Sequence, residues 1–232
     1  MRFNIIVAFD KNRGIGVNNK IPWNFRQDMS YFKNVTKGAG DNAVIMGKNT
    51  YLSLKKPLPY RDNIVLSTTL TNKDVDEKVI LCKNMKQMFD FITNKDENKV
   101  TPKSYHDRTM VSNSYNKRVN SKIESKNNTT EVGSTIFPNL HVNIPDNSIT
   151  SYDDIWIIGG SEIYKQFLDM PEYINKVYVT LVEDEYNCDT FFPELPDYYV
   201  LEHSSVTSEN NVLLRFIIYN NAYQDTRTYS MM

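Results

Sequence analysis

A run of apolar residues, two glycines and the start of a helix follow one another in the stretch Ile155-Trp156-Ile157-Ile158-Gly159-Gly160-Ser161-Glu162-Ile163-Tyr164. Consecutive apolar residues of this length are typical of a strand buried on both faces of a parallel sheet. The glycines allow close approach of the backbone, and the helix start presents free N–H groups and the positive end of its dipole. Such a turn suits a phosphate group. A purely steric glycine turn is an equally good interpretation, because the segment is not a complete dinucleotide fingerprint.

Further apolar runs predict the sheet around this strand. Runs with the length and β-branched content of buried strands cover residues 3–9, 42–46, 63–66, 155–158 and 176–182. Helical periodicity, as crossover connections require, covers residues 25–35, 85–93 and 161–168. Residues 198–203 and 212–219 predict a C-terminal hairpin, with residues 204–211 as its polar turn region. The predicted fold class is α/β, with a mainly parallel central sheet, flanking helices and an antiparallel C-terminal edge hairpin.

Composition narrows the class of protein. The chain has 232 residues, is 40% hydrophobic and carries a net charge of −1. Without a long basic run, nucleic acid is not expected to be the main partner, so the substrate is expected to be small. Cys82 and Cys188 match no metal or redox spacing, and the histidines add no ligand cluster, so no metal site is expected. No apolar run approaches membrane-spanning length and the N-terminus lacks a signal peptide, which favours a reducing, cytoplasmic location.

One polar segment interrupts this pattern. Residues 94–150 are dominated by Asn, Ser, Thr and Lys, and they separate a predicted helix from the strand that should follow. A loop of this length is unusual inside a compact domain, so the segment is either a disordered surface insertion, which we favour, or an accessory element. We expect a single domain over residues 1–220 that contains this insertion. The polar tail 221–232 is either a native terminus or the start of a linker in a longer bifunctional protein.

Asp28 is a carboxylate placed among aromatic residues. It follows Ile21-Pro22-Trp23 by five residues, and Phe25, Met29, Phe32 and Val35 recur around it at steps of three and four. This spacing predicts a helix in which Asp28 borders the buried stripe. A carboxylate in such surroundings needs a partner, so it is either a helix cap or a ligand-binding group, and taken alone the cap is favoured.

Two other segments offer positive charge. Gly47, Lys48 and Thr50 lie where a strand leads into a helix start, which makes a second anion site plausible beside the simpler interpretation of an exposed lysine. Arg61 follows the rigid Pro57-Leu58-Pro59 turn immediately before a strand. An arginine held in this way suits a carboxylate, although a surface arginine is the simpler explanation.

In this order and spacing, the segments resemble the dihydrofolate reductase family. The matching positions are Ala8, Asp28 and residues 14–16, 21–23, 31–32, 44–50, 57–67, 157–164, 179–180 and 189–193. They cover both ends of the chain and omit the insertion. The resemblance implies reduction of 7,8-dihydrofolate to 5,6,7,8-tetrahydrofolate by hydride transfer from NADPH, in support of one-carbon metabolism and thymidylate synthesis.

The resemblance also implies a substrate site. Asp28 would accept hydrogen bonds from the pterin ring, Thr180 would bridge to the same carboxylate, and Trp23 would complete the catalytic set. Arg61 would hold the α-carboxylate of the glutamate tail. The remaining substrate-binding residues, most of which would line the walls around the rings, would be Ile6, Val7, Phe32, Leu54, Leu58 and Ile158. The proton for N5 would come from water, and burial should raise the pKa of Asp28.

For the cofactor, the resemblance implies that Gly159 and Gly160 lie over the pyrophosphate with a cis peptide between them. Lys48, Ser67, Thr68 and Lys83 would surround the ribose 2′-phosphate, although Asn49 and Thr68 stand where many members carry a basic residue. The other implied cofactor-binding positions are Ala8, Ile15, Gly16, Gly47, Asn49, Thr50, Ser161, Glu162, Ile163 and Tyr164. Residues 10–23 would form the mobile loop over the nicotinamide.

Two alternatives remain at this point. A reductase of the same fold that acts on a ribosylaminopyrimidine in riboflavin synthesis also uses NADPH, but it should lack the pterin carboxylate. A binding module with an inactive reductase core would dock a partner through the insertion. The family resemblance further implies inhibition by antifolates such as methotrexate and a possible link to, or cooperation with, thymidylate synthase.

Overall fold

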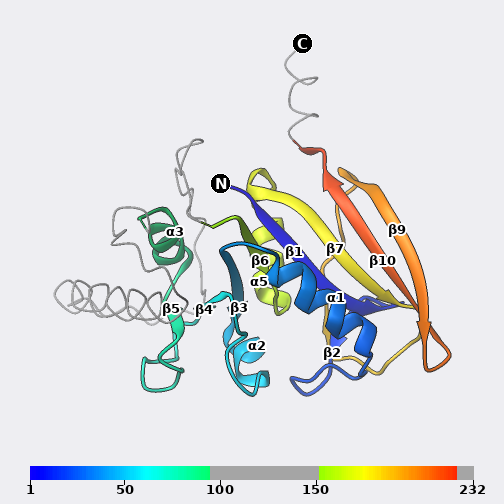
Figure 1. The fold of residues 1–232 in the computed structure, drawn as a ribbon, viewed down its shortest axis with the longest axis horizontal. Helices are drawn as coiled ribbons and strands as arrows, with labels where there is room; N and C mark the ends of the chain where they lie inside the picture. The colour runs from blue at the N-terminus through cyan, green and yellow to red at the C-terminus, as the bar shows by residue number, and fades with distance from the viewer. Residues whose placement is uncertain (95–151, 224–232) are drawn as a thin grey trace, which may run out of the picture.

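The computed structural model describes residues 1–94 and 152–223 (Figure 1). Within them, one eight-stranded sheet has the order β5-β4-β3-β6-β1-β7-β10-β9, and a small sheet pairs β2 with β8. The strands are β1 (Phe3–Asp10), β2 (Gly14–Gly16), β3 (Asn42–Gly47), β4 (Asp62–Leu66), β5 (Val79–Cys82), β6 (Asp154–Ile157), β7 (Ile174–Val182), β8 (Thr190–Phe191), β9 (Tyr199–Glu209) and β10 (Val212–Asn221). The helices are α1 (Arg26–Lys37), α2 (Lys48–Ser53), α3 (Met85–Asn94), α5 (Ser161–Leu168) and the 3-10 helix η2 (Pro171–Tyr173).

Most of the large sheet is parallel, as predicted. β1 pairs in parallel with β6 and β7, β3 pairs with β4 and β6, and β4 pairs with β5. Only β10 and β9 at one end of the described sheet run antiparallel to their neighbours. The carboxyl ends of β3, β6 and β1 therefore meet at one edge, where ligands bind in open α/β sheets.

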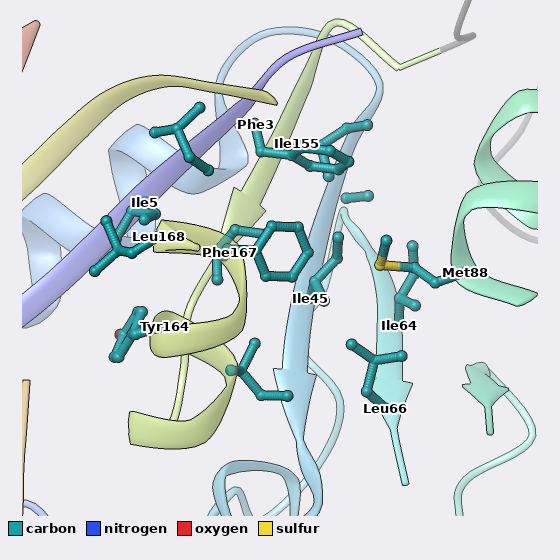
Figure 2. Packing of buried hydrophobic residues seen from close by; sticks show 14 of the residues in the cluster. Phe3, Ile5, Ile45, Ile64, Leu66, Met88, Ile155, Tyr164, Phe167 and Leu168 are labelled. Atoms are coloured by element: carbon teal, nitrogen blue, oxygen red, sulfur yellow. The ribbon is translucent and has the colours of Figure 1, made fainter. Parts of the chain in front are cut away.

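Helices cover both faces of the sheet. α3 and α5 pack on one face, where Phe167 meets Phe3 edge to face with ring centroids 5.1 Å apart (Figure 2). α1 and α2 pack on the other face, where Tyr51, Phe32 and Val35 contact the cluster around Val44 and Trp156. Side chains alternate between faces along each strand, so the two layers take their apolar residues from alternate positions.

The helix over residues 25–35 is confirmed as α1, but its buried stripe is not the expected one. Met29 is 55% exposed, whereas Asp28 is only 8% exposed. The buried face follows Phe25, Asp28 and Thr36, with the half-buried Phe32 between Asp28 and Thr36. Met29 lies one residue, about 100°, away from Asp28. Asp28 thus belongs to the buried face and does not merely border it.

The C-terminal hairpin is confirmed, but residues 204–209 are strand and not turn. β9 continues to Glu209, and the turn consists of Asn210 and Asn211, whose φ values are 52° and 63°. Asparagine tolerates this left-handed backbone, which a tight two-residue hairpin turn requires. Most of the polar side chains that suggested a turn are exposed on an edge strand, and Thr207 and Glu209 are half-buried there. β5, at residues 79–82, is a further strand that the sequence analysis did not predict.

The predicted insertion and tail lie outside the described residues, apart from Asn94 and residues 221–223. In the described part of the chain, no helix combines the length and apolar character needed to cross a bilayer.

Candidate functional site

Two strand-to-helix turns that the sequence analysis treated separately lie against each other. The Gly47 N–H, at the end of β3, donates to the Gly159 carbonyl oxygen after β6 over 2.7 Å. A Cβ placed on Gly160 would lie 3.4 Å from Thr50 Oγ1, and one on Gly47 would lie 3.0 Å from Ile163 Cγ1. The starts of α2 and α5 therefore meet at the carboxyl edge of the sheet, and together they offer backbone N–H groups to one region.

Gly159 has no room for a side chain. Its φ is +99°, and a Cβ there would lie 2.7 to 2.9 Å from Tyr164 ring and hydroxyl atoms. The Gly159–Gly160 peptide is cis, as the family resemblance implied. The Tyr164 hydroxyl donates to the Ile6 carbonyl oxygen over 2.8 Å, and complete burial raises the pKa of Tyr164. Tyr164 therefore joins α5 to β1 beneath the double glycine.

Asp28 does not cap its helix. The N-cap of α1 is Phe25, which forms no side-chain cap hydrogen bond. The Asp28 carboxylate instead accepts a hydrogen bond from the hydroxyl of Thr180 on β7. Burial raises the pKa of Asp28 and is the largest effect, the Thr180 hydrogen bond opposes it, and the negative charge of Glu209 adds to it. Thr180 pairs with Ala8 of β1. The Asp28 carboxylate is therefore near β1, the strand whose Ile6 carbonyl oxygen accepts the Tyr164 hydroxyl.

Trp23 lies next to Ala8, the residue of β1 that pairs with Thr180. It is 8% exposed and packs with Phe25, Val182 and Leu214. Its ring lies 5.0 Å from that of Tyr186, centroid to centroid. Trp23 Nε1 is buried and has no hydrogen-bond acceptor among the described residues. The indole N–H is therefore available to donate to a small molecule.

Most of the predicted wall residues come together. One apolar cluster contains Ile6, Phe32, Leu54, Leu58 and Ile158. Val7 is the exception, because it is packed in the cluster on the opposite face of the sheet. Neighbouring residues of a strand point to opposite faces, so Ile6 and Val7 cannot both present side chains to one ligand.

Arg61 is buried, at 4% exposure, and is not the surface arginine that remained an alternative. Its Nη1 donates to Thr36 Oγ1 near the end of α1, and its Nε donates to the Pro59 carbonyl oxygen over 3.2 Å. The guanidinium carbon lies 6.0 Å from the centroid of the Phe32 ring. A buried guanidinium held by α1 and by its own turn is suited to bind a carboxylate.

Lys48 and Lys83 reach the same loop, which follows β4. Lys48 Nζ donates to Thr69 Oγ1 over 3.0 Å, and Lys83 Nζ donates to the Leu70 carbonyl oxygen. Ser67 Oγ accepts the Leu70 N–H over 3.1 Å. The sequence analysis named Thr68 and not Thr69, which is the threonine that Lys48 contacts. Both threonines are exposed, and no sequence signal distinguishes two adjacent threonines. Asn49 is exposed on α2.

The segment that carries Ile15 and Gly16 is held beside α5. β2 pairs with β8, and Ser161 Oγ donates to the Phe191 carbonyl oxygen over 2.7 Å. Asp189 N donates to the Gly16 carbonyl oxygen over 3.0 Å. Glu162 is exposed in the first turn of α5. The predicted cofactor residues on both sides of this contact are therefore neighbours in space.

Comparison with known proteins agrees with this architecture. The family model described as dihydrofolate reductase matches residues 2–101 and 109–221. Dihydrofolate reductase of Drosophila melanogaster is 30% identical over 204 residues, which cover 85% of this chain and 82% of the relative. That of Haemophilus influenzae is 28% identical over 195 residues, covering 84% and 81%. A bifunctional dihydrofolate reductase-thymidylate synthase of Daucus carota is 28% identical over 204 residues, covering 84% of this chain and 29% of the relative. With a family match over nearly all of its described residues and a site of this geometry, the chain belongs to the dihydrofolate reductase family.

Proposed function

We propose that the protein reduces 7,8-dihydrofolate to 5,6,7,8-tetrahydrofolate with NADPH as the hydride donor, and so supports one-carbon metabolism and thymidylate synthesis. The observation that carries the proposal is the buried Asp28 carboxylate, hydrogen-bonded to Thr180 and located in the described structure without an ion-pair partner. A carboxylate kept at such a cost is expected to serve a ligand. A pterin ring offers it the N3 and 2-amino donors.

The apolar residues of one cluster support the rest of the substrate. Ile6, Phe32, Leu54 and Ile158 supply apolar walls for flat rings, with Leu58 further out. Arg61 lies beyond Phe32, at a position suited to the α-carboxylate of the glutamate tail. Val7 contributes through its backbone only, since its side chain is packed on the other face.

A dinucleotide phosphate fits the double-glycine region. A Cβ on Gly159 would fill the space beside Tyr164, and Gly47 and Gly160 bring two helix starts together. Lys48 and Lys83 supply positive charge at the loop that contains Ser67 and Thr69, which favours a ribose 2′-phosphate and hence NADPH over NADH. Ala8, Ile15, Gly16, Asn49, Thr50, Thr68, Ser161, Glu162 and Ile163 complete the proposed contact set. When bound, NADPH supplies the hydride.

The chain's own residues orient the substrate and control the proton. Asp28, bonded to Thr180, accepts hydrogen bonds from N3 and the 2-amino group of the pterin ring. Trp23 Nε1 donates to a water or to a substrate oxygen. Among the described residues that make up this site, Asp28 is the only carboxylate at the ring, so the proton that N5 gains comes from water. Asp28 favours that step by stabilising the protonated or enolised pterin.

Partners and location follow from the same proposal. We propose that antifolates such as methotrexate bind at Asp28, that the enzyme is linked to or cooperates with thymidylate synthase, and that residues 1–220 form one domain. A relative from Plasmodium berghei carries the name of a bifunctional dihydrofolate reductase-thymidylate synthase. Cys82 and Cys188 are both free, as is usual in the reducing cytoplasm.

The test is the loss of NADPH absorbance when the purified protein meets dihydrofolate. Wild-type protein should turn over, NADH should be a poorer donor, and Asp28→Asn should lower kcat/KM by about a hundredfold or more. Glu202→Gln, which removes a β9 carboxylate paired with Lys176 of β7, is the matched control and should retain activity. Tight NADPH binding without turnover of dihydrofolate would overturn the proposal in favour of another pterin or pyrimidine substrate.

A further inference from the structure

The first turn of α1 is held by a residue from the other end of the chain. Glu209 Oε1 accepts the Arg26 N–H and Glu209 Oε2 accepts the Gln27 N–H, each over 2.9 Å. Gln27 Nε2 in turn donates to the Ser208 carbonyl oxygen over 3.0 Å. Because Phe25 offers no cap of its own, Glu209 takes the place of the missing helix cap.

The opposite end of α1 is held in a comparable way. Asn42 Nδ2, at the start of β3, donates to the carbonyl oxygens of Thr36 and Lys37 over 3.2 and 2.9 Å. Both ends of the helix are thus bonded to side chains of the central sheet. Asp28 lies in the first turn, so the contacts of Glu209 act on the part of the helix that carries it.

Glu209 is itself held in place by the tight hairpin. It pairs with Val212 in the β9–β10 ladder and precedes the two-residue turn of Asn210 and Asn211. The two amide hydrogen bonds, together with the positive charge of Arg26, lower the pKa of Glu209, so it is an anion at neutral pH. A charged acceptor gives stronger hydrogen bonds to helix-start amides than a neutral one.

Glu209 differs from the other groups near Asp28 in its charge. From β7 the neighbour is the neutral Thr180 hydroxyl, and the phenols of Tyr31 and Tyr178 have raised pKa values, so they are neutral too. On α1 itself, Arg26 faces Glu209. Glu209 is the charged group whose repulsion acts on Asp28 and favours its protonated form.

We propose that Glu209 is a positioning residue for the substrate site: by binding the Arg26 and Gln27 amides it keeps the first turn of α1, and with it Asp28, in register with Thr180. The inference rests on the proposed role of Asp28 in binding dihydrofolate. The tip of the β9–β10 hairpin thereby acquires a role in positioning Asp28, although the hairpin contributes no residue to the proposed substrate or cofactor contacts.

The experiment compares wild type with Glu209→Ala, which removes both acceptors and the charge, and Glu209→Gln, which keeps one acceptor oxygen and removes the charge. Glu202→Gln on the same strand is the control. Glu209→Ala should raise the KM for dihydrofolate about three- to tenfold while the KM for NADPH stays unchanged. In Glu209→Gln the pH profile of kcat/KM should move to lower pH by a few tenths of a unit, since removal of the repulsion lowers the pKa of Asp28.

A second readout separates this inference from the proposed function. Carboxyl ¹³C NMR follows the titration of Asp28 directly, and its pKa should fall in Glu209→Gln but not in Glu202→Gln, whether or not dihydrofolate is turned over. Equal rises in KM for both ligands, or an Asp28 titration that Glu209→Gln leaves in place, would overturn the positioning role. The wild type could fail to reduce dihydrofolate while the pKa of Asp28 falls in Glu209→Gln as expected. In that case the proposed function fails, and the contact of Glu209 with the first turn of α1 stands.

Discussion

The Thr180 hydroxyl on β7 donates a hydrogen bond to the Asp28 carboxylate on α1, and the two side chains are only 2% and 8% exposed. The hydrogen bond favours the charged form of Asp28, whereas burial and the charge of Glu209 favour the protonated form. Burial is the larger effect, so the folded protein binds this proton more tightly than the unfolded chain does. The site therefore keeps a carboxylate where a neutral residue would be more stable.

Asp28→Asn should accordingly stabilise the free protein while it lowers kcat/KM for dihydrofolate by about a hundredfold or more. At pH 7 the wild type bears the cost of a buried anion, and the amide does not, so the Tm of the variant should be higher by about 2 °C. Differential scanning calorimetry without ligands measures the difference. Thr180→Val is the contrasting variant, because it removes the hydrogen bond that stabilises the anion and should lower the Tm at the same pH. A lower Tm for Asp28→Asn would contradict the assignment of burial as the dominant effect.

The same raised pKa predicts a pH dependence of stability. Between the ordinary pKa of an aspartate and the raised pKa in the folded state, the folded protein binds more protons than the unfolded chain. The contribution of Asp28 is therefore fully present below the unfolded pKa and is lost as pH rises through the folded pKa. Urea unfolding of wild type and Asp28→Asn across this range should give a free energy difference that grows with pH in favour of the variant. A constant difference would show that the pKa of Asp28 is not raised.

Local sequence patterns predicted the elements of the site better than the contacts between them. The strand–glycine–helix stretch at Gly159 and the helix of Asp28 rest on residues close in sequence, and both were found where expected. The buried Arg61 bonds to Thr36, and the cap of α1 is Glu209, which lies 182 residues from Gln27. No local pattern carries such partners. Residues 204–209 were misread because an exposed edge strand and a turn both favour polar side chains.

Substitutions in the double glycine should separate two kinds of constraint. Gly159→Ala adds a Cβ at 2.7 Å from the Tyr164 ring on a backbone with φ of +99°, so it should lower the free energy of unfolding by about 2 to 4 kcal/mol. In Gly160→Ala the nearest atom is Thr50 Oγ1 at 3.4 Å, an ordinary contact, and the loss should stay below about 1 kcal/mol. Chemical denaturation measures both. Equal losses would mean that the Tyr164 contact does not limit position 159.

Arg61→Lys should weaken binding of the glutamate tail and leave the reaction itself intact. Lysine keeps the charge but loses the planar fork, which now contacts both Thr36 and the Pro59 carbonyl oxygen. The KM for dihydrofolate should rise about tenfold or more with kcat little changed. Dihydropteroate, which lacks the glutamate, provides the internal control and should be reduced equally well by both proteins. An equal loss with dihydropteroate would assign Arg61 to the structure of the site and not to the tail.

Lys48→Gln should reduce the preference for NADPH over NADH. Lys48 already bonds to Thr69, so its ammonium group is held at the loop proposed for the 2′-phosphate, and the variant removes its charge from that loop. The kcat/KM for NADPH should fall about tenfold or more, while that for NADH, which has no 2′-phosphate, should stay within about twofold. Lys55→Gln, at an exposed lysine just past α2, is the matched control and should change neither value. Because Lys83 reaches the same loop, the double variant Lys48→Gln with Lys83→Gln should lose more of the NADPH preference than Lys48→Gln alone. A parallel loss with NADH would place Lys48 at the pyrophosphate, where both cofactors bind alike.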